Sequence, residues 1–448
     1  MKQQPLSFGS IFAIGLMLFA LFFGAGNMIF PPLLGQQAGE HMWIAIFGFL
    51  LTGVGLPLLG VIAIAYTGGD PQKLASRAHP IFGIIFTITL YLAIGPFFAL
   101  PRTGTVTYEI GILPFLPENL ISSDWPLLLF SILFFTISAW LSLNPSKIVD
   151  RVGKLLTPAL LVVLAALIAG AFITPMGEPA APIGDFENSS FFKGFIEGYL
   201  TLDALAALVF AIVVISAVKE RGITDRTTIV KITIYSSLIA VTCLALVYIG
   251  LSYLGATSID AVGVHENGGG LLSAASAYMF GSGGAIILGL AIAAACLTTA
   301  IGLIVSTSSY FAQLVPSISY KSFVIIFSGF SMLVSNLGLT QLISISVPVL
   351  VIIYPLAIVL ILLSFLDSLF SGYRAVYVGS LIPTFFIGIV DGLTAAGLDI
   401  SGLASSLHFL PLMEQGVGWI VPAIIGGMIG YGIASIFKHV PNASNVSS

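Results

Sequence analysis

The sequence predicts an all-α integral membrane protein with twelve transmembrane helices. Of its 448 residues, 58% are hydrophobic and only 8% are charged, and the mean hydropathy is +1.10. A soluble domain carries about 25% charged residues, so this chain has too few charges to cover a water-facing surface. The apolar residues form runs long enough to cross a bilayer, and the basic residues gather in every second gap between the runs. The sequence contains no basic stripe suited to nucleic acid.

A transmembrane helix needs about 20 mostly apolar residues. The gaps between such runs are too short for a soluble domain, so residues 1–448 are expected to form a single transmembrane domain. The predicted spans are 8–34, 43–66, 81–108, 126–143, 154–174, 190–217, 228–254, 278–310, 322–338, 341–365, 374–390 and 417–437.

The basic residues test this count independently, because short cytoplasmic loops concentrate Lys and Arg. With the N-terminus in the cytoplasm, twelve spans put every Lys and Arg on one side except two. The exceptions are Arg102, inside span three, and Lys193, near the outer end of span six. A wrong number of spans would place the Lys and Arg residues on both sides of the membrane. An even number of spans with both termini in the cytoplasm is therefore predicted.

Span one contains residues that a lipid-facing helix would not need. Gly24, Ala25, Gly26 and Asn27 lie near its middle, and each glycine disfavours a helix by about 1 kcal/mol relative to alanine. Unwound backbone in a membrane survives only where it is buried or lines a polar cavity. A break here would point free N–H groups at an anion and free carbonyls at a cation. Close helix packing is the alternative, but the spacing of GAGN does not match a small-xxx-small motif.

Four carboxylates and cations within or next to the predicted spans are candidates for a role, since a charge inside the membrane costs roughly 2.5–3.5 kcal/mol. Span three holds Arg102 and Glu109, and span six holds Glu197 and Asp203. Asp203 lies deepest, and it either has a function or pairs with Arg102 to tie two helices together. Arg102 and Glu109 are seven residues apart on one helix face, which also suits a structural pair. Glu197 lies near the outer interface.

Span six is irregular at a position that corresponds to the break in span one. Each of these two spans begins a block of five, at about 8–175 and about 190–365. Interrupted segments at matching positions of two halves indicate a transporter site near the membrane midplane. Because five is odd, the second block enters from the opposite side, so the blocks are predicted to be inverted repeats. Two additional helices, at about 374–437, lie outside the repeat.

Span eight carries small and hydroxyl-bearing residues at helical spacing, including Ala295, Thr298 and Thr299. Hydroxyl oxygens are hard ligands that suit Na⁺. Threonine hydroxyls in a membrane helix also bond back to the carbonyl four residues earlier, and the sequence leaves both roles open.

The segment LFALFFGAGNMIFPP, the stretch TLDAL and the twelve-span pattern resemble the branched-chain amino acid:cation symporter family, the BrnQ-like carriers. The resemblance covers essentially the whole chain. It implies uptake of leucine, isoleucine and valine across a bacterial plasma membrane by alternating access, coupled to Na⁺ or H⁺. It also implies the inverted five-plus-five fold of the LeuT-like superfamily, with helices one and six broken. An enzyme activity, a cofactor other than the coupling ion and an obligate protein partner are not implied.

The resemblance also suggests which residues bind the substrate. The GAGN segment is similar to the GxGN at the break of the first helix in LeuT-type carriers, where amides cap the substrate carboxylate. The stretch TLD resembles TLS in the sixth helix, with an acid in place of the serine. That departure leaves open whether the acid meets the substrate ammonium, meets a cation or carries a proton. The implied substrate-binding residues are Gly24, Ala25, Gly26, Asn27, Thr201, Leu202 and Asp203.

The same likeness suggests a cation site, because LTT in span eight is similar to the LTS of the eighth helix. Na⁺ is the favoured coupling ion, since paired hydroxyls beside a helix break suit it, and a proton carried by Asp203 is the alternative. The implied Na⁺ ligands are the carbonyls of Ala20, Phe23 and Ala295 and the hydroxyls of Thr298 and Thr299.

Two other functions remain open at this point. One is a carrier of the same fold for another amino acid or a nucleobase, but a polar base would call for more Asn, Gln and Glu near the breaks. An intramembrane enzyme would need a catalytic set inside the spans, and the five histidines lie nearly all in loops. A Cβ at Gly26 is expected to narrow the approach of the carboxylate and to disfavour a positive φ.

Overall fold

The fold is a bundle of helices, seen in a computed structural model that describes residues 6–121, 123–143 and 148–437. No strand occurs in these residues. Seven of their helices are long and apolar enough to cross a membrane, or eight when the bent pair Phe186–Thr201 and Asp203–Lys219 counts as one span. Shorter apolar helices cover Phe8–Phe22, Pro158–Ile173 and Tyr320–Ser335, and a fourth covers Ile420–Ile436. The predicted all-α membrane protein is confirmed, while the count of twelve spans stays a prediction.

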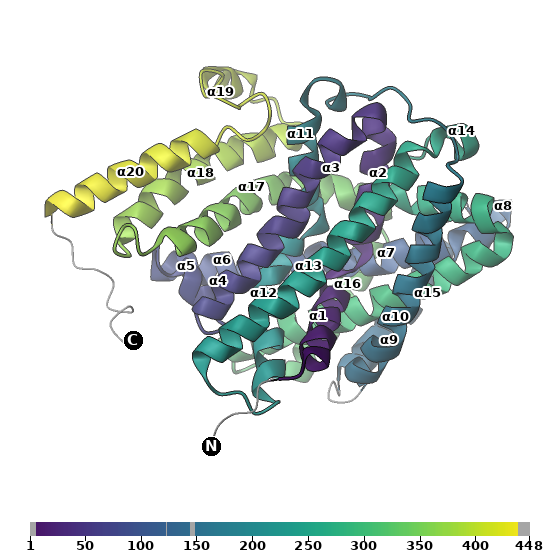
Figure 1. Cartoon of the computed structure of the whole chain (residues 1–448), viewed down its shortest axis with the longest axis horizontal. Helices are drawn as coiled ribbons and strands as arrows, with labels where there is room; N and C mark the ends of the chain where they lie inside the picture. The colour runs from purple at the N-terminus through teal and green to yellow at the C-terminus, as the bar shows by residue number, and fades with distance from the viewer. Residues whose placement is uncertain (1–5, 122, 144–147, 438–448) are drawn as a thin grey trace.

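The described residues up to 173 form ten α-helices, coloured purple to blue in Figure 1. They are α1 (Phe8–Phe22), α2 (Ala25–Ala38), α3 (Met42–Leu50), α4 (Leu56–Tyr66), α5 (Pro71–Ala75), α6 (Pro80–Leu92), α7 (Ala99–Gly111), α8 (Glu118–Ile121), α9 (Trp125–Ser142) and α10 (Ile148–Ile173). Two π-helical segments, η2 (Leu51–Gly55) and η3 (Ala93–Phe97), and two short 3₁₀ turns, η1 (Gly39–His41) and η4 (Leu113–Phe115), complete this half.

The described residues from 186 to 437 contain a 3₁₀ turn, η5 (Gly198–Thr201), and ten more α-helices. They are α11 (Phe186–Glu197), α12 (Asp203–Lys219), α13 (Arg226–Ala256), α14 (Ile259–Val262), α15 (Gly268–Leu314), α16 (Tyr320–Ser335), α17 (Leu339–Leu366), α18 (Arg374–Ala395), α19 (Ser401–Ser406) and α20 (Ile420–Phe437).

Helix α15 begins at Gly268, well before the start at residue 278 that the sequence suggested. The Asn267 side chain accepts hydrogen bonds from the N–H groups of Gly269 and Gly270 and so starts the helix among glycines. The helix then bends at Gly281, where φ is 67°. The glycine-rich, less apolar first part hid this helical segment from a hydropathy criterion.

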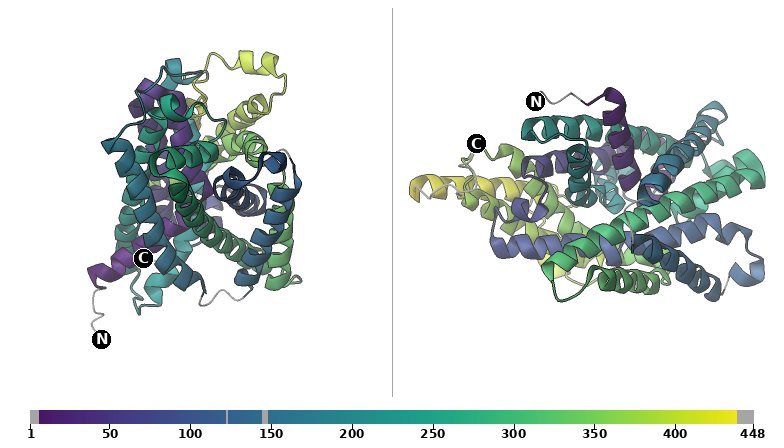
Figure 2. Two further views of the ribbon diagram at one scale, coloured as in Figure 1. Left: turned by 90° about the vertical axis from the view of Figure 1, so that its right-hand side faces the viewer. Right: turned by 90° about the horizontal axis from the view of Figure 1, so that it is seen from below.

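The helices of the two halves interleave, so that the broken spans face each other inside the bundle. Helix α13 runs beside both α1 and α2, α12 packs on α4, and α15 packs on α7. Helices α18 and α20 pack on each other and form one edge of the molecule, at the left of Figure 1 and again at the left of the view from below in Figure 2. This arrangement surrounds the two breaks with protein rather than lipid.

The contact between α2 and α13 is close enough to require glycine on both sides. A Cβ on Gly35 of α2 would lie 1.8 Å from the carbonyl oxygen of Ser252, and a Cβ on Gly255 of α13 would lie 1.9 Å from the carbonyl oxygen of Pro32. Small residues let helix backbones approach this closely in membranes. The two helix backbones are therefore in direct contact at each of these glycines.

Candidate functional site

Span one is interrupted at Phe23 and Gly24, as the GAGN segment predicted. Phe23 has ψ 86° and Gly24 has φ −117° and ψ −160°, so both leave helical geometry between α1 and α2. The Gly24 N–H donates to Asn27 Oδ1 at 3.1 Å instead of to the carbonyl of Ala20. The break thus exposes the last carbonyls of α1 and the first N–H groups of α2, which have no partner within a helix.

The prediction of a positive φ at Gly26 was wrong. Gly26 lies in the first turn of α2, and its φ is not in the left-handed region. A Cβ on Gly26 would lie 3.2 Å from Arg102 Nη1 and 3.3 Å from the carbonyl oxygen of Leu200. Glycine is therefore favoured here because these two groups lie close to the Gly26 Cα, and not because of the backbone conformation.

Span six breaks where TLD predicted it. Leu202 adopts a left-handed conformation, with φ 66° and ψ 7°, between the 3₁₀ turn η5 and helix α12. The two flanking segments are bent by 42°. The Thr201 hydroxyl donates to the Gly198 carbonyl at 2.9 Å, and the Asp203 N–H donates to Thr201 Oγ1 at 3.3 Å. A leucine with positive φ costs of order 1–3 kcal/mol, and such strain clusters at functional sites.

Asp203 joins the two broken spans to α13. Its Oδ2 accepts hydrogen bonds from Asn27 Nδ2 at 2.7 Å and from the Tyr248 hydroxyl at 2.5 Å. Asn27 Nδ2 also contacts the Tyr248 oxygen. All three side chains are buried. Both donors reach Oδ2, which leaves Oδ1 without either of them.

Arg102 is buried beside this network, only 1% exposed, but does not pair with Asp203. Its Nη1 donates to the Leu200 carbonyl at 2.6 Å and its Nη2 to Ser346 Oγ at 3.2 Å, while its guanidinium carbon lies 5.0 Å from the centroid of the Phe30 ring. Its Nε has no hydrogen-bond partner. Within the part of the chain that the structure describes, no carboxylate lies at ion-pair distance. The suggested structural pairs of Arg102 with Asp203 and with Glu109 are therefore wrong.

Both breaks and both charged groups line one small cavity. Its volume is about 30 Å³, far below the roughly 300–1,000 Å³ of ligand pockets, so its walls must separate to admit an amino acid. Its polar wall contains Gly24, Gly26, Asn27, Arg102 and Asp203. Its apolar wall consists of Leu21, Phe22, Ile94, Ala206, Phe210 and Leu303.

The two threonines of span eight differ in their surroundings. Thr298 Oγ1 donates to the Ala295 carbonyl at 2.7 Å, the back-bonding that was left open. Thr299 Oγ1 is buried without a hydrogen-bond partner and lies 3.3 Å from the position of a Cβ on Gly24. The structure therefore brings the Thr299 hydroxyl to the break in span one, whereas the Thr298 hydroxyl is bonded within its own helix. Ala20 lies in the last turn of α1, and Phe23 lies at the break itself.

The remaining charged residues of the spans lie away from the cavity. Glu197 forms an ion pair with Lys193 at 3.2 Å, which agrees with its expected place near the outer end of span six. Glu109 does not line the cavity.

Sequence reasoning missed Tyr248 and the apolar wall. Tyr248 lies in an apolar run of α13 that also contains Tyr235 and Tyr253, so its hydroxyl gave no distinct signal. Ile94 is brought in by a third irregularity, the π-helical segment η3, where Gly95 has φ −87° and ψ −121° before Pro96. That proline was the sign that span three is not a regular helix.

Comparison with known proteins gives consistent matches over the whole chain. A family model described as "Branched-chain amino acid transport protein" matches residues 8–437. The chain is 52% identical to the branched-chain amino acid permease BrnQ of Bacillus subtilis, over 97% of this chain and 99% of the relative. It is 48% identical to the branched-chain amino acid transport system 2 carrier protein of Pseudomonas aeruginosa, over 93% of this chain and 94% of that protein.

Solved structures share the fold at low sequence identity. The structure of MhsT in complex with L-phenylalanine superposes with a TM-score of 0.59 at 16% identity, covering 98% of this chain and 100% of MhsT. The nucleobase-cation-symport-1 family transporter Mhp1, in a closed conformation with bromovinylhydantoin bound, gives 0.60 at 12% identity and covers 98% and 96% of the two chains. The expected LeuT-like fold is supported by these neighbours.

Proposed function

The chain belongs to the branched-chain amino acid transport protein family, and from this premise we propose that it is a secondary active symporter for leucine, isoleucine and valine with Na⁺ as its coupling ion. It is a transporter and not an enzyme. It works by alternating access in a bacterial plasma membrane, as twelve spans in two inverted repeats of five plus two helices, with both termini in the cytoplasm.

One observation carries the proposal for the substrate. A buried guanidinium, that of Arg102, and a buried carboxylate, that of Asp203, line the same cavity and do not pair with each other. Buried charges are costly unless they are paired, so a ligand that carries both charges on neighbouring atoms supplies what each lacks. The amino acid head group is such a ligand.

The orientation of the substrate follows from the helix break. The carboxylate binds at the first turn of α2, where free N–H groups and the helix dipole favour an anion, and Arg102 lies 3.2 Å from the position of a Cβ on Gly26. The ammonium binds Asp203 through Oδ1, because Asn27 and Tyr248 already occupy Oδ2. The aliphatic side chain then extends toward the apolar wall at Phe22 and Phe210, whose ring centroids lie 6.2 Å apart.

Na⁺ binds at the other side of the break. The Ala20 carbonyl has lost its N–H donor to the Asn27 side chain, and the unpartnered Thr299 hydroxyl lies beside Gly24. Na⁺ is a hard cation and is held by oxygen ligands. Thr298, Ala295 and Phe23 complete the proposed set once Thr298 turns from its bond to the Ala295 carbonyl. If the ion is H⁺ instead, Asp203 is the group that carries it.

Uptake of labelled leucine into proteoliposomes tests the proposal. With no pH gradient, an inward Na⁺ gradient should drive accumulation of leucine, and replacing external Na⁺ by choline should remove it. If Na⁺ has no effect and a proton gradient drives uptake, the Thr299 site is wrong and Asp203 takes the coupling role. If labelled leucine is not taken up under either gradient, the proposed cargo is wrong.

A further inference from the structure

Helices α18 and α20 pack together at one side of the molecule (Figure 1). A groove much larger than the central cavity lies on that side. Its volume is about 870 Å³, and its walls come from α4, η2, α11, α17, α18 and α20. We call it the lateral groove and define it by six of its lining residues: Leu59, Phe195, Leu363, Val376, Trp419 and Ala423. Its place between the bundle and the helices outside the predicted repeat separates it from the substrate cavity.

The lining of the lateral groove suits hydrocarbon. Among the described residues that line it, only Ser380, Trp419 and Tyr431 carry a polar side-chain atom. Its lip is formed by exposed apolar side chains, including Ile424 and Met428. An apolar cavity of this size opening toward lipid is filled most favourably by an acyl chain, since each buried CH₂ is stabilising.

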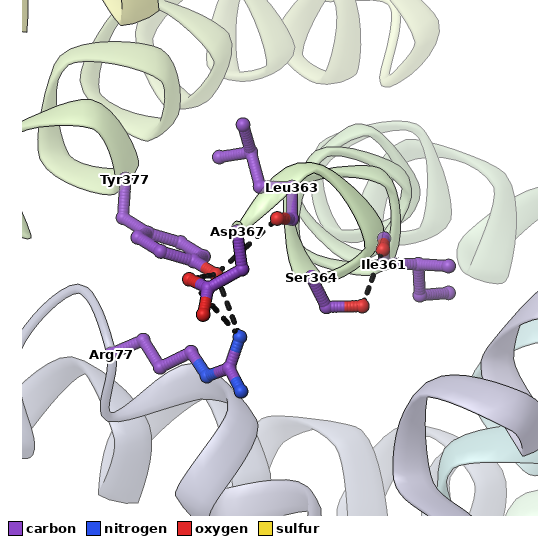
Figure 3. Close-up of polar contacts among 6 residues, drawn as sticks. All are labelled: Arg77, Ile361, Leu363, Ser364, Asp367 and Tyr377. Atoms are coloured by element: carbon purple, nitrogen blue, oxygen red, sulfur yellow. Dashed lines mark hydrogen bonds and ion pairs between the residues drawn. The ribbon is translucent and has the colours of Figure 1, made fainter. Parts of the chain in front are cut away.

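One end of the lateral groove is closed by a polar cluster whose two charged side chains pair with each other. Arg77 Nη1 lies 3.3 Å from Asp367 Oδ1 and donates to the Tyr377 hydroxyl at 2.9 Å. That hydroxyl donates to Asp367 Oδ1 at 2.8 Å and lies 3.4 Å from the carbonyl oxygen of Leu363, whose residue lines the groove (Figure 3). The Arg77–Asp367 ion pair leaves this cluster without net charge.

A second arginine at the same end is free to meet an anion. Arg374, the first residue of α18, lies two residues from the groove-lining Val376 and is exposed. Among the contacts of the described residues, only its Nε is engaged, donating to the Ala78 carbonyl at 2.6 Å. Tyr373 and the lining residue Tyr431 pair beside it, with ring centroids 6.3 Å apart. Exposed Arg with neighbouring Tyr is typical of the lipid head-group region.

We propose that the lateral groove binds one anionic phospholipid, with an acyl chain between α17 and α20 and the phosphate at the guanidinium of Arg374. The inner wall of the groove connects this lipid site to the break of span six. Phe195 precedes η5, and its carbonyl accepts a hydrogen bond from Thr52 Oγ1 at 2.7 Å. The bound chain therefore supports the segment that leads into the break of span six.

Trp419 reports on the groove directly. It lines the groove and is only 4% exposed, and the other three tryptophans of the chain, Trp43, Trp125 and Trp140, lie elsewhere on the surface. Replacing those three by Phe leaves Trp419 as the single tryptophan, and its fluorescence can then be measured alone. The protein is reconstituted in phosphatidylcholine vesicles that contain a minor fraction of lipid with brominated acyl chains, either phosphatidylglycerol or phosphatidylcholine.

Brominated phosphatidylglycerol should quench Trp419 more strongly than brominated phosphatidylcholine at the same fraction. Arg374→Gln should weaken the preference for the anionic lipid about fivefold, the equivalent of roughly 1 kcal/mol per basic residue at a lipid surface. Arg374→Lys should keep most of it. Ala423→Phe, and independently Gly55→Leu, should fill the groove and remove most of the quenching, whereas Ala166→Phe on the exposed face of α10 should not.

Equal quenching by both brominated lipids, unchanged by Arg374→Gln, would overturn the assignment of an anionic lipid. Absence of quenching by either lipid would show that another occupant, such as a second copy of the chain, covers the groove. Quenching that survives both Ala423→Phe and Gly55→Leu in folded protein would place the lipid outside the groove. None of these outcomes depends on transport activity, so the proposal is tested separately from the proposed symport.

Discussion

The substitution Asp203→Asn separates the charge of this side chain from its hydrogen bonds. An amide oxygen in place of Oδ2 can still accept from Asn27 and Tyr248, which lie at 2.7 and 2.5 Å, so the network that holds the breaks together is kept. What is lost is the negative charge that faces the cavity. A hydrogen bond to a charged group contributes about 1.5–3 kcal/mol, so leucine affinity should fall about 10- to 140-fold. The Coulomb attraction of two unit charges about 4 Å apart, roughly 4 kcal/mol at an effective dielectric constant near 20, is an upper bound.

The assay is a scintillation proximity measurement of leucine binding at saturating Na⁺, with 4-methylpentanoate as competitor. This analogue keeps the carboxylate and side chain of leucine but lacks the ammonium, so Asp203→Asn should change its affinity little. Tyr248→Phe is the matched control, because it keeps the charge and removes a neutral donor, a loss of about 0.5–1.5 kcal/mol. Unchanged leucine affinity in Asp203→Asn, or an equal loss for leucine and the analogue, would refute ammonium binding. Intact exchange of leucine with loss of its pH dependence would instead indicate that Asp203 carries a proton.

Four further predictions concern the other walls of the cavity. Gly26→Val should abolish leucine binding in correctly inserted protein, because its Cβ would crowd Arg102 Nη1 at 3.2 Å; unchanged affinity in the proximity assay would contradict the site. Leucine, isoleucine and valine should compete with labelled leucine, with about a fourfold loss per CH₂ removed, and strong competition by lysine or adenine would contradict the apolar pocket. Thr299→Ala should raise the Na⁺ concentration for half-maximal binding far more than Thr298→Ala does, with little effect on leucine at saturating Na⁺. Ala206→Leu should narrow the apolar wall and weaken leucine more than valine; equal weakening of both would show that Ala206 does not face the side chain.

The positions of the breaks were predictable because their chemistry is local. Gly24 and Gly26 inside an apolar run conflict with a regular membrane helix, and an acid as deep as Asp203 requires partners wherever it lies. These conflicts are visible in a single sequence. They predict the two breaks that meet at the cavity.

The partners of these residues were not predictable, because they depend on how distant segments pack. Tyr248 is 45 residues from Asp203 and has no distinguishing neighbours in sequence. Phe22 and Phe210 look the same in sequence as the many aromatic residues that face lipid. Arg102 was suggested as a partner of Asp203, but the register of α7 directs its guanidinium to the Leu200 carbonyl instead. Thr298 and Thr299 are adjacent and chemically identical, and only their orientations on α15 distinguish them.

The reciprocal glycine contacts between α2 and α13 also determine which parts of the protein can move relative to each other. Where one backbone lies directly on another at Gly35 and again at Gly255, neither helix can roll or slide without a collision of main-chain atoms. Helices α2 and α13 therefore behave as one rigid unit. Phe23 and Gly24, which leave helical geometry, join this unit to α1, so a change in the angle between α1 and α2 has to occur at these residues. A Cβ at Gly35 or Gly255 should accordingly disrupt the packing of α2 on α13. Substitutions at Phe23 should instead change the transport rate.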